Sequence, residues 1–311
     1  MTNHVLKLTN QEINEMKEHY KDYMIGNLPQ GALFTAKHQG CTITAYQSGK
    51  VLFQGKNSEL VAAKWSKFEG GETSVKKNSP FSPPTDISTM SVIGSDEVGT
   101  GDYFGPITVT AAYVSKENIP LLQSLGVKDS KNLSDNQICA IAQKLIKKIP
   151  YSLLILHNEK YNELQRKGMS QGKMKAMLHN QAIHHVLTKI HPSKPEAILI
   201  DQFVEPSTYY KHNENKSIPL KHLTYFSTKA ESIHIAVASA SIISRYAFLK
   251  EMDKLSEKAG FSLPKGASQL VDEACAQLID KHGEKILSHF TKMHFANTEK
   301  ALSIFNNQKY K

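Results

Sequence analysis

The fold is decided by residues 90–114, which read MSVIGSDEVGTGDYFGPITVTAAYV. Residues 90–95 and 107–114 are apolar, β-branched runs of the kind that forms buried strands. Three glycines, Gly99, Gly101 and Gly105, lie between the two runs and predict a glycine-rich bend that joins the strands. Asp96 and Glu97 follow directly on the first strand. Core packing alone does not explain a pair of carboxylates at this position.

Strands and helices alternate in the sequence that follows. Residues 134–137 read SDNQ, the pattern of a capping box, and predict a helix from Ser134 to about Lys148. Further strands are expected over residues 151–157 and 197–200, and further helices over residues 172–190, 230–257 and 268–282. This order predicts an α/β domain over residues 86–311, in which helices cover a central sheet.

Residues 1–70 predict a separate and small α+β unit. A capping box formed by Thr9 and Glu12 begins a helix that is expected to end near Ile25. Three runs rich in β-branched and aromatic residues follow at 32–36, 42–46 and 51–54, and the turns between them predict a strand meander. A second helix is expected from Ser58 to about Phe68. Residues 71–85 contain three prolines and no apolar periodicity, which predicts a linker.

Composition narrows the class of protein. A chain of 311 residues that is 40% hydrophobic is long enough for two domains with buried cores. Its 38 Lys and Arg against 29 Asp and Glu give a net charge of +9, which favours a polyanionic partner such as nucleic acid, although mild basicity also serves solubility. Cys41, Cys139 and Cys275 lie too far apart to form the pairs of a zinc site.

No apolar run approaches the length of a membrane-spanning helix, and the first residues lack the apolar stretch of a signal peptide. We therefore expect a cytoplasmic protein with no membrane partner. No pattern in the sequence indicates an obligatory protein partner.

Carboxylates stand at three places where buried elements end or begin. Asp96 and Glu97 close one predicted strand, Asp201 follows another, and Glu231 opens a helix rich in alanine and serine. Buried carboxylates repel each other unless a positive charge lies among them, and oxygen ligands suit Mg²⁺. Each residue alone also has an ordinary explanation, because Asp favours turns and a Glu at a helix start favours the helix dipole. Spacing by itself does not bring the four together.

Three motifs resemble those of the ribonuclease HII/HIII group. Residues 95–106 read SDEVGTGDYFGP, residues 127–134 read VKDSKNLS, and residues 228–232 read TKAES before the alanine- and serine-rich helix. Two positions favour ribonuclease HIII over ribonuclease HII. Thr100 stands where the HII pattern has an arginine, and Glu231 stands where HII has an aspartate. The similarity covers residues from about Val92 to the end of the chain.

The resemblance implies a ribonuclease H-like mixed sheet flanked by helices. It implies that Asp96, Glu97, Asp201 and Glu231 are the catalytic residues and bind two Mg²⁺ or Mn²⁺ ions. The expected reaction is hydrolysis of the RNA strand of RNA–DNA hybrids, with 5′-phosphate and 3′-hydroxyl ends, and its expected role is to remove RNA from hybrids during replication and repair. It also implies that residues 1–70 resemble one repeat of the TATA-binding protein and help to hold the hybrid.

Several residues have two interpretations that the sequence leaves open. The backbone of Gly99, Thr100 and Gly101 is a candidate for recognising the ribose 2′-hydroxyl, or it only forms a tight bend. Ser130 and Lys131 precede a capped helix and are candidates for phosphate binding, or they organise a turn and lie in solvent.

Three neighbouring features are left open or set aside in the same way. The basic side chains of Arg166, Lys167, Lys173 and Lys175 either follow the backbone of the hybrid or form an exposed helix face. His234 is interpreted as a packed histidine and Asp102 as a turn residue, so neither is placed in the site.

Two rival functions follow from the same residues. The first is activity of the ribonuclease HII type on single ribonucleotides embedded in DNA. The second is a non-catalytic nucleic-acid-binding protein on a nuclease scaffold. The intact set of four costly acidic residues argues against the second rival.

Overall fold

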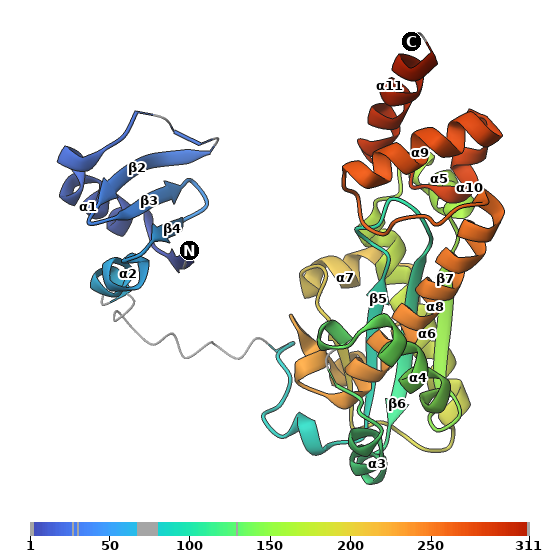
Figure 1. Cartoon of the computed structure of the whole chain (residues 1–311). Coiled ribbons are helices and arrows are strands. Elements are labelled where there is room, and N and C mark those ends of the chain that lie inside the picture. The colour runs from blue at the N-terminus through green and yellow to red at the C-terminus, as the bar shows by residue number, and fades with distance from the viewer. Residues whose placement is uncertain (1–2, 27, 30, 67–79, 129, 310–311) are drawn as a thin grey trace. The chain divides into compact units, whose positions relative to one another are not determined.

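The computed structural model describes residues 3–26, 28–29, 31–66, 80–128 and 130–309, and it divides into two compact units, residues 1–79 and 80–311 (Figure 1). The division falls inside the predicted linker 71–85, of which residues 71–79 lie outside the described part. Phe81, at the other end of that linker, belongs to the second unit, because its carbonyl accepts a hydrogen bond from the Phe226 amide (2.9 Å).

The N-terminal unit is built on a four-stranded antiparallel sheet with the strand order β1-β4-β3-β2. Its elements are β1 (Asn3–Lys7), α1 (Asn10–His19), β2 (Ala32–His38), β3 (Cys41–Tyr46), β4 (Lys50–Gly55) and α2 (Ser58–Ser66). The three-strand meander and the capping box at Thr9 are confirmed. The edge strand β1 was not predicted, because its five residues alternate weakly between polar and apolar types.

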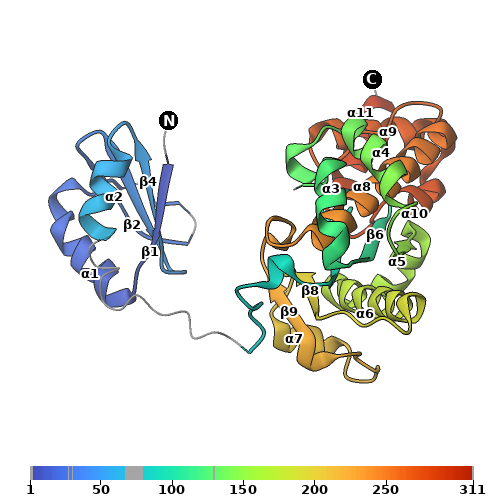
Figure 2. The same cartoon turned by 90° about the horizontal axis from the view of Figure 1, so that it is seen from below.

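Helix α1 is shorter than predicted. It ends at His19 rather than near Ile25, and a 3₁₀ turn over Lys21–Tyr23 follows. The chain turns where Tyr20 enters the core, since its ring is 1% exposed and its hydroxyl accepts a hydrogen bond from Trp65 Nε1 (3.0 Å). Both helices pack on the same face of the sheet (Figure 2), against side chains such as Phe34 and Ile43.

The second unit contains a mixed five-stranded sheet with the order β7-β6-β5-β8-β9. Its strands are β5 (Val92–Val98), β6 (Ile107–Val114), β7 (Tyr151–Leu156), β8 (Ala197–Asp201) and β9 (Thr224–Ser227). β5, β6 and β7 form an antiparallel meander, whereas β8 and β9 run parallel to β5. The predicted mixed α/β architecture is therefore confirmed.

Helices flank this sheet on both faces, with α8 on one and α6 on the other (Figure 1). The helices are α3 (Ile119–Ser124), α4 (Asp135–Leu145), α5 (Asn158–Arg166), α6 (Gln171–Ile190), α7 (Pro206–His212), α8 (Ile235–Ala259), α9 (Gln269–His282), α10 (Leu287–Phe290) and α11 (Asn297–Lys309). The capping box at Ser134 is confirmed at the start of α4. Strand β9 and helices α3, α5, α7, α10 and α11 were not predicted, because they are short or, like α5, mostly polar in sequence.

Helix α8 lies in backbone contact with strand β5. A Cβ atom placed on Gly94 would lie 2.2 Å from the Val237 nitrogen and 2.3 Å from the Ala236 carbonyl carbon, so only glycine fits there. The first half of α8 is small and buried, as its alanine- and serine-rich sequence predicted. This close packing holds β5 and the start of α8 at a fixed separation.

Candidate active site

Two aspartates are brought together by the parallel pairing of β5 and β8. Ser95 is the register partner of Ile200, and Asp96 and Asp201 are the next residues of the two strands. Carboxyl ends of parallel strands meet at one edge of a sheet, so these two side chains are neighbours although they lie far apart in the sequence. The close approach has an electrostatic consequence at Asp96.

The Asp96 side chain is buried, with 5% of the residue exposed. Burial raises the pKa of its carboxyl well above the usual value, and the nearby Glu97 and Asp201 carboxylates raise this pKa further. The Glu97 amide donates a hydrogen bond to Asp96 Oδ1 (2.7 Å), and the hydroxyl of Ser241 opposes the rise in pKa. Unbalanced negative charge of this kind favours a bound cation.

Glu231 reaches the same place from the 3₁₀ turn Ala230–Ser232, which precedes α8. The Ala230 amide donates a hydrogen bond to Asp201 Oδ1 (2.8 Å) and thereby fixes the turn to the end of β8. Glu231 is 6% exposed, and Ser241 Oγ donates to its Oε2 (3.4 Å). Burial raises the pKa of Asp201, which the Ala230 amide partly offsets.

The structure gives Ser130 and Lys131 contacts that neither interpretation of the sequence contained. Ser130 is buried, and its hydroxyl lies 2.9 Å from Ser241 Oγ. Lys131 Nζ donates to Glu231 Oε1 (2.5 Å), while its side chain is 68% exposed. Ser130 therefore supports Ser241, which in turn contacts Glu231. Lys131 supplies a positive charge that compensates the Glu231 carboxylate. Asp129, which precedes them in the motif, lies outside the described residues.

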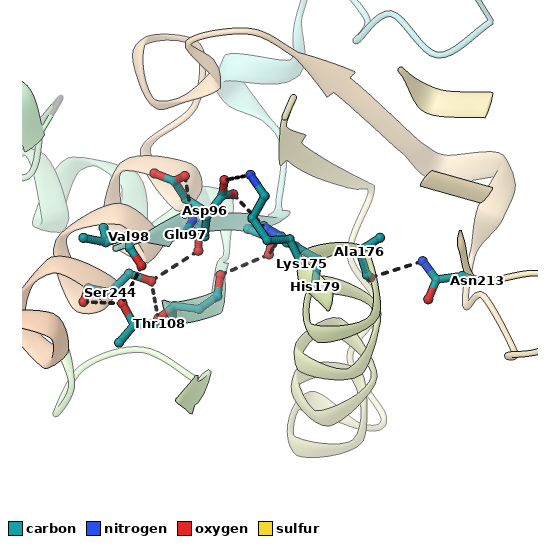
Figure 3. Close-up of polar contacts among 11 residues, drawn as sticks. Asp96, Glu97, Val98, Thr108, Lys175, Ala176, His179, Asn213 and Ser244 are labelled. Carbon is teal, nitrogen blue, oxygen red and sulfur yellow. Dashed lines mark hydrogen bonds and ion pairs between the residues drawn. The ribbon is translucent and has the colours of Figure 1, made fainter. Parts of the chain in front are cut away.

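Glu97 points toward the opposite face of the sheet and meets helix α6 (Figure 3). Lys175 Nζ lies 2.7 Å from its Oε1, and His179 Nε2 lies 3.0 Å from its Oε2. Burial alone would raise the pKa of Glu97, but the hydrogen bonds and charges of His179 and Lys175 together lower it. Lys175 is 7% exposed, so it is not available to follow a nucleic-acid backbone. Arg166, Lys167 and Lys173 are exposed and keep both interpretations.

The four acidic residues supply only oxygen donors, which fits Mg²⁺ or Mn²⁺. Within the part of the chain that the structure describes, however, no three or more His, Cys, Asp or Glu side chains are already arranged as a metal-holding group. Glu97 contacts Lys175 and His179 instead, and Glu231 contacts Lys131. The assignment of the four carboxylates as metal ligands stays a prediction. The burial of the Asp96 carboxylate close to other carboxylates favours it.

Two residues that the sequence set aside have structural contacts. His234 is 2% exposed, its Nδ1 accepts from the Ala236 amide (3.0 Å), and its Nε2 donates to the Met90 carbonyl (3.1 Å). With both nitrogens occupied, His234 caps helix α8 and has no lone pair for a metal. Asp102 Oδ1 accepts from the Gly266 amide (2.6 Å) and braces a loop.

The glycines of the bend after β5 differ in their surroundings. Gly99 has a φ of +93°, and a Cβ there would lie 2.1 Å from the Pro106 carbonyl oxygen, so the bend itself requires glycine. A Cβ on Gly101 would meet no atom within 4 Å, which leaves that backbone approachable. Gln171 Nε2, at the start of α6, donates a hydrogen bond to the Thr100 carbonyl (3.2 Å). This contact holds the Thr100–Gly101 peptide in place.

Sequence reasoning missed Ser241 and His179, and it placed Lys175 in a basic stretch without predicting its contact with Glu97. Lys175 and His179 stand four residues apart and thus on one face of a helix, which is the only signal that the sequence offers. Their role depends on which strand faces α6, and this information is tertiary. Ser241 stands in the buried half of α8, where its hydroxyl gave no distinct pattern.

Comparisons with known proteins give matches over nearly the whole chain. Residues 93–298 match the family described as Ribonuclease HII, and residues 3–78 match one described as Domain of unknown function (DUF3378). A protein named Ribonuclease HIII from Bacillus licheniformis is 60% identical, over 98% of this chain and 99% of its own length. Its namesake from Bacillus subtilis is 61% identical, over 97% of both chains.

Solved structures extend the similarity to the fold. Bst-RNase HIII in complex with Mn²⁺ is 44% identical, covers 98% of this chain and 100% of its own, and superposes with a TM-score of 0.70. The structure of its Q54A mutant gives a TM-score of 0.69 at the same identity. In the described residues of our chain, no helix is both long and apolar enough to cross a membrane.

Proposed function

The chain belongs to the ribonuclease HIII family, and from this premise we propose that it cleaves the RNA strand of RNA–DNA hybrids endonucleolytically. The products are 5′-phosphate and 3′-hydroxyl ends, and the cellular role is removal of RNA from hybrids in the cytoplasm during replication and repair. The observation that carries the proposal is the parallel pairing of β5 and β8, which sets Asp96 beside Asp201. Glu97 and Glu231 complete the acidic set.

We assign Asp96, Glu97, Asp201 and Glu231 as ligands of two divalent cations, Mg²⁺ or Mn²⁺. The neighbour that was crystallised with Mn²⁺ supports a divalent cation in this family. When bound, such ions activate water for attack on a phosphodiester and stabilise the departing oxygen. The protein side of the reaction is to supply the carboxylates, and the carboxyl pKa of Asp96 is raised by burial and by the nearby Glu97 and Asp201 carboxylates, whose repulsion a cation would relieve.

Lys131 has the reach for a second task in this reaction. Its ammonium contacts Glu231 while most of its side chain is exposed. A substrate phosphate that approaches the carboxylates brings negative charge to the same point, and the ammonium of Lys131 is the nearest described cation on the exposed side of Glu231. We assign Lys131, together with the Ser130 backbone region, to phosphate binding on these grounds.

Recognition of RNA is assigned to the bend after β5. The open surroundings of Gly101 let the Thr100–Gly101 peptide approach a ribose, and the 2′-hydroxyl is the group that distinguishes RNA from DNA. Gln171 orients this peptide through the Thr100 carbonyl. We assign the Gly99 backbone to the same contact, and Gly99 also has a structural part, because its φ of +93° in the bend favours glycine.

The N-terminal unit is assigned to hybrid binding through the sheet face that its helices do not cover. Thr42 and Tyr46 lie half-buried on this face, whereas Thr44, between them, is only 4% exposed and contributes little contact area. Leu52 and Gln54 of β4 lie on the same face, opposite Thr44 and Thr42 in the register. The wide minor groove of a hybrid suits a flat sheet surface of this kind.

The test is cleavage of two labelled substrates, one a continuous RNA–DNA hybrid and the other a DNA duplex with a single ribonucleotide. We expect efficient cleavage of the hybrid with Mg²⁺ or Mn²⁺, none with a chelator, and weak incision at the lone ribonucleotide, since Thr100 stands where the HII pattern has arginine. Comparable rates on both substrates would return the specificity to the HII type. Hybrid binding without any metal-dependent cleavage would contradict the assignment of the site.

A further inference from the structure

Glu97 differs from the other three carboxylates in that helix α6 engages both of its oxygens. Lys175 contacts Oε1 at 2.7 Å and His179 contacts Oε2 at 3.0 Å, and Figure 3 shows both side chains rising from α6 toward the end of β5. The two residues are one helical turn apart, so a single rigid element presents both. Because an ionised carboxylate only accepts hydrogen bonds, Nε2 of His179 is the donor in its contact.

His179 is itself fixed from three sides. It is fully buried, its Nδ1 lies 2.6 Å from Ser95 Oγ, and its ring stacks on Phe203 with centroids 4.9 Å apart and planes inclined by 22°. Ser95 is the residue of β5 two positions before Glu97, so strand and helix are tied twice on this face. The imidazole therefore has one orientation available to it.

Lys175 is fixed in a related way. Its ammonium lies 4.4 Å from the centroid of the same Phe203 ring, and its side chain is 9% exposed. The contrast with Lys131 is large, because the Lys131 side chain is 68% exposed where it meets Glu231. Of the two lysines that neutralise the acidic set, Lys175 is thus built into the core and Lys131 lies on the surface.

We propose that Lys175 and His179 are positioning residues that clamp the Glu97 carboxylate in place, so that this one ligand is oriented before any ion arrives. The inference rests on the proposed function, since it assumes that Glu97 is a ligand. Each Glu97 oxygen has two lone pairs, and the clamp uses one on each, which leaves one on each oxygen for a cation. Partners behind a metal ligand commonly contribute 10- to 100-fold to metal affinity.

Substitution of Lys175 tests the proposal through the direction of the change in metal affinity as well as through its size. An ammonium close to a cation site repels the cation. If this repulsion were its only effect, removal of the ammonium would tighten metal binding. Its removal as a clamp has the opposite effect, because a buried carboxylate without its partner reorients or takes up a proton. The direction of the change in affinity therefore separates the two roles.

The experiment is calorimetric titration of the full-length chain with Mn²⁺, in the absence of nucleic acid, for Lys175→Met and His179→Ala. Lys173→Met is the matched control, since Lys173 is an exposed lysine on the same helix. His179→Gln restores a donor from the same position. We expect about 10- to 100-fold weaker Mn²⁺ binding for Lys175→Met and His179→Ala, recovery toward wild type for His179→Gln, and no change for Lys173→Met.

The outcomes are distinguishable. Unchanged or tighter Mn²⁺ binding by Lys175→Met overturns the clamp, and so does equal weakening by Lys173→Met. Hybrid affinity measured with chelator should be the same in wild type, Lys175→Met and His179→Ala, and a decrease in these two variants would make Lys175 and His179 substrate-binding residues instead. If His179→Ala does not fold, Lys175→Met and His179→Gln still decide the matter. A wild-type chain that binds no Mn²⁺ overturns the proposed function itself.

Discussion

The two sheets of this molecule are built differently, and the difference explains where charge is tolerated. In the N-terminal unit, four antiparallel strands carry helices on one face only. In the second unit, five mixed strands lie between α8 and α6, and β5 and β8 run parallel. Hairpins join β2 to β3 and β3 to β4, whereas the parallel strands β5 and β8 bring their carboxyl ends to the same edge of the sheet. The parallel pair therefore creates a place where several carboxylates meet.

Buried charge follows the same division. Among the described residues, every Asp, Glu, Lys or Arg that is buried belongs to the second unit: Asp96, Lys175, Glu231, Asp272 and Lys292. The buried polar residues of the N-terminal unit are Thr35, Thr44 and Ser58, which are uncharged. One sheet thus buries only uncharged polar side chains, and the other provides an environment in which a buried charge requires a partner. Four predictions test this division, in order of expected effect.

The largest effect is expected for Asp201→Asn. The amide oxygen still accepts from the Ala230 amide, so the turn before α8 persists, but the negative charge for a cation is removed. We expect turnover to fall by about 10³-fold, equivalent to about 4 kcal/mol, while hybrid affinity stays measurable. Asp102→Asn is the matched control, since Asp102 also accepts from a backbone amide, that of Gly266. Turnover of Asp201→Asn within a few-fold of wild type would remove Asp201 from the site.

The second effect concerns the pH dependence of stability. Burial lowers the pKa of His234 from 6.5 to about 4, so between these values the unfolded chain binds a proton that the folded chain does not. Stability therefore falls as the pH is lowered from 6.5 to 4, by up to about 3 kcal/mol at 1.36 kcal/mol per unit. His234→Asn keeps a helix cap and has no such titration.

The two units can be followed separately in that experiment. Trp65 is the only tryptophan of the chain and lies in the N-terminal unit, so its fluorescence reports urea unfolding of that unit, while circular dichroism reports both. His234→Asn should reduce the pH dependence of the free energy of unfolding that is obtained from the circular dichroism transition. The transition followed by Trp65 fluorescence should have the same pH dependence in wild type and variant. The same pH slope in wild type and variant would show that His234 is not the group involved.

The third prediction places an extra methyl group at the contact of α8 with β5. Gly94→Ala forces these backbones apart, and overpacking of this kind costs about 1–3 kcal/mol. Gly172→Ala is the control, because a Cβ there meets its nearest atom, Val204 Cγ1, at an ordinary 3.5 Å. Equilibrium unfolding should show destabilisation for Gly94→Ala alone, with the Trp65 transition unchanged. Equal stability of the two variants would contradict the close contact.

The smallest effect is expected from removal of the N-terminal unit. The truncation should begin at Pro80 rather than after residue 85, because Phe81 belongs to the second unit and packs on Phe226 with ring centroids 6.3 Å apart. We expect hybrid affinity to fall about tenfold, or about 1.4 kcal/mol, and the salt dependence to become shallower by about one for each phosphate that the truncated chain no longer binds. Turnover at saturating hybrid should change little. Unchanged affinity and salt slope in a folded truncated chain would remove the binding role.

Sequence reasoning found the strands that carry the site, because β5, β6 and β8 are continuous apolar runs whose signal is local. It also found both capping boxes, since Thr9 and Ser134 bond within four residues of themselves. Helix α5 escaped it, because a helix whose sequence is mostly polar has little apolar periodicity to detect. Each of these outcomes depends only on neighbours along the chain.

The side chains that contact the carboxylates could not be predicted from neighbours along the chain. Lys175 was grouped with Arg166, Lys167 and Lys173 as one basic stretch, yet the structure buries it against Glu97 and leaves the others exposed. Which lysine of a helix faces inward depends on the rotation of the helix against the sheet, and this rotation is set by packing. The motif resemblance located the acids, but it did not indicate which cations neutralise them.

The backbone contact at Gly94 has a consequence for the time scale on which the site adjusts. Since β5 and the first turn of α8 touch without intervening side chains, they cannot slide or hinge independently, and the turn with Glu231 is tied to Asp201 beside them. Adjustment of the site then falls to side-chain torsions, such as those of Lys131, the exposed partner of Glu231. Exposed side chains change rotamer in picoseconds to nanoseconds, whereas hinge motions of whole elements take microseconds to milliseconds. Arrival of a cation should therefore leave no slow conformational phase in the kinetics of this sheet edge.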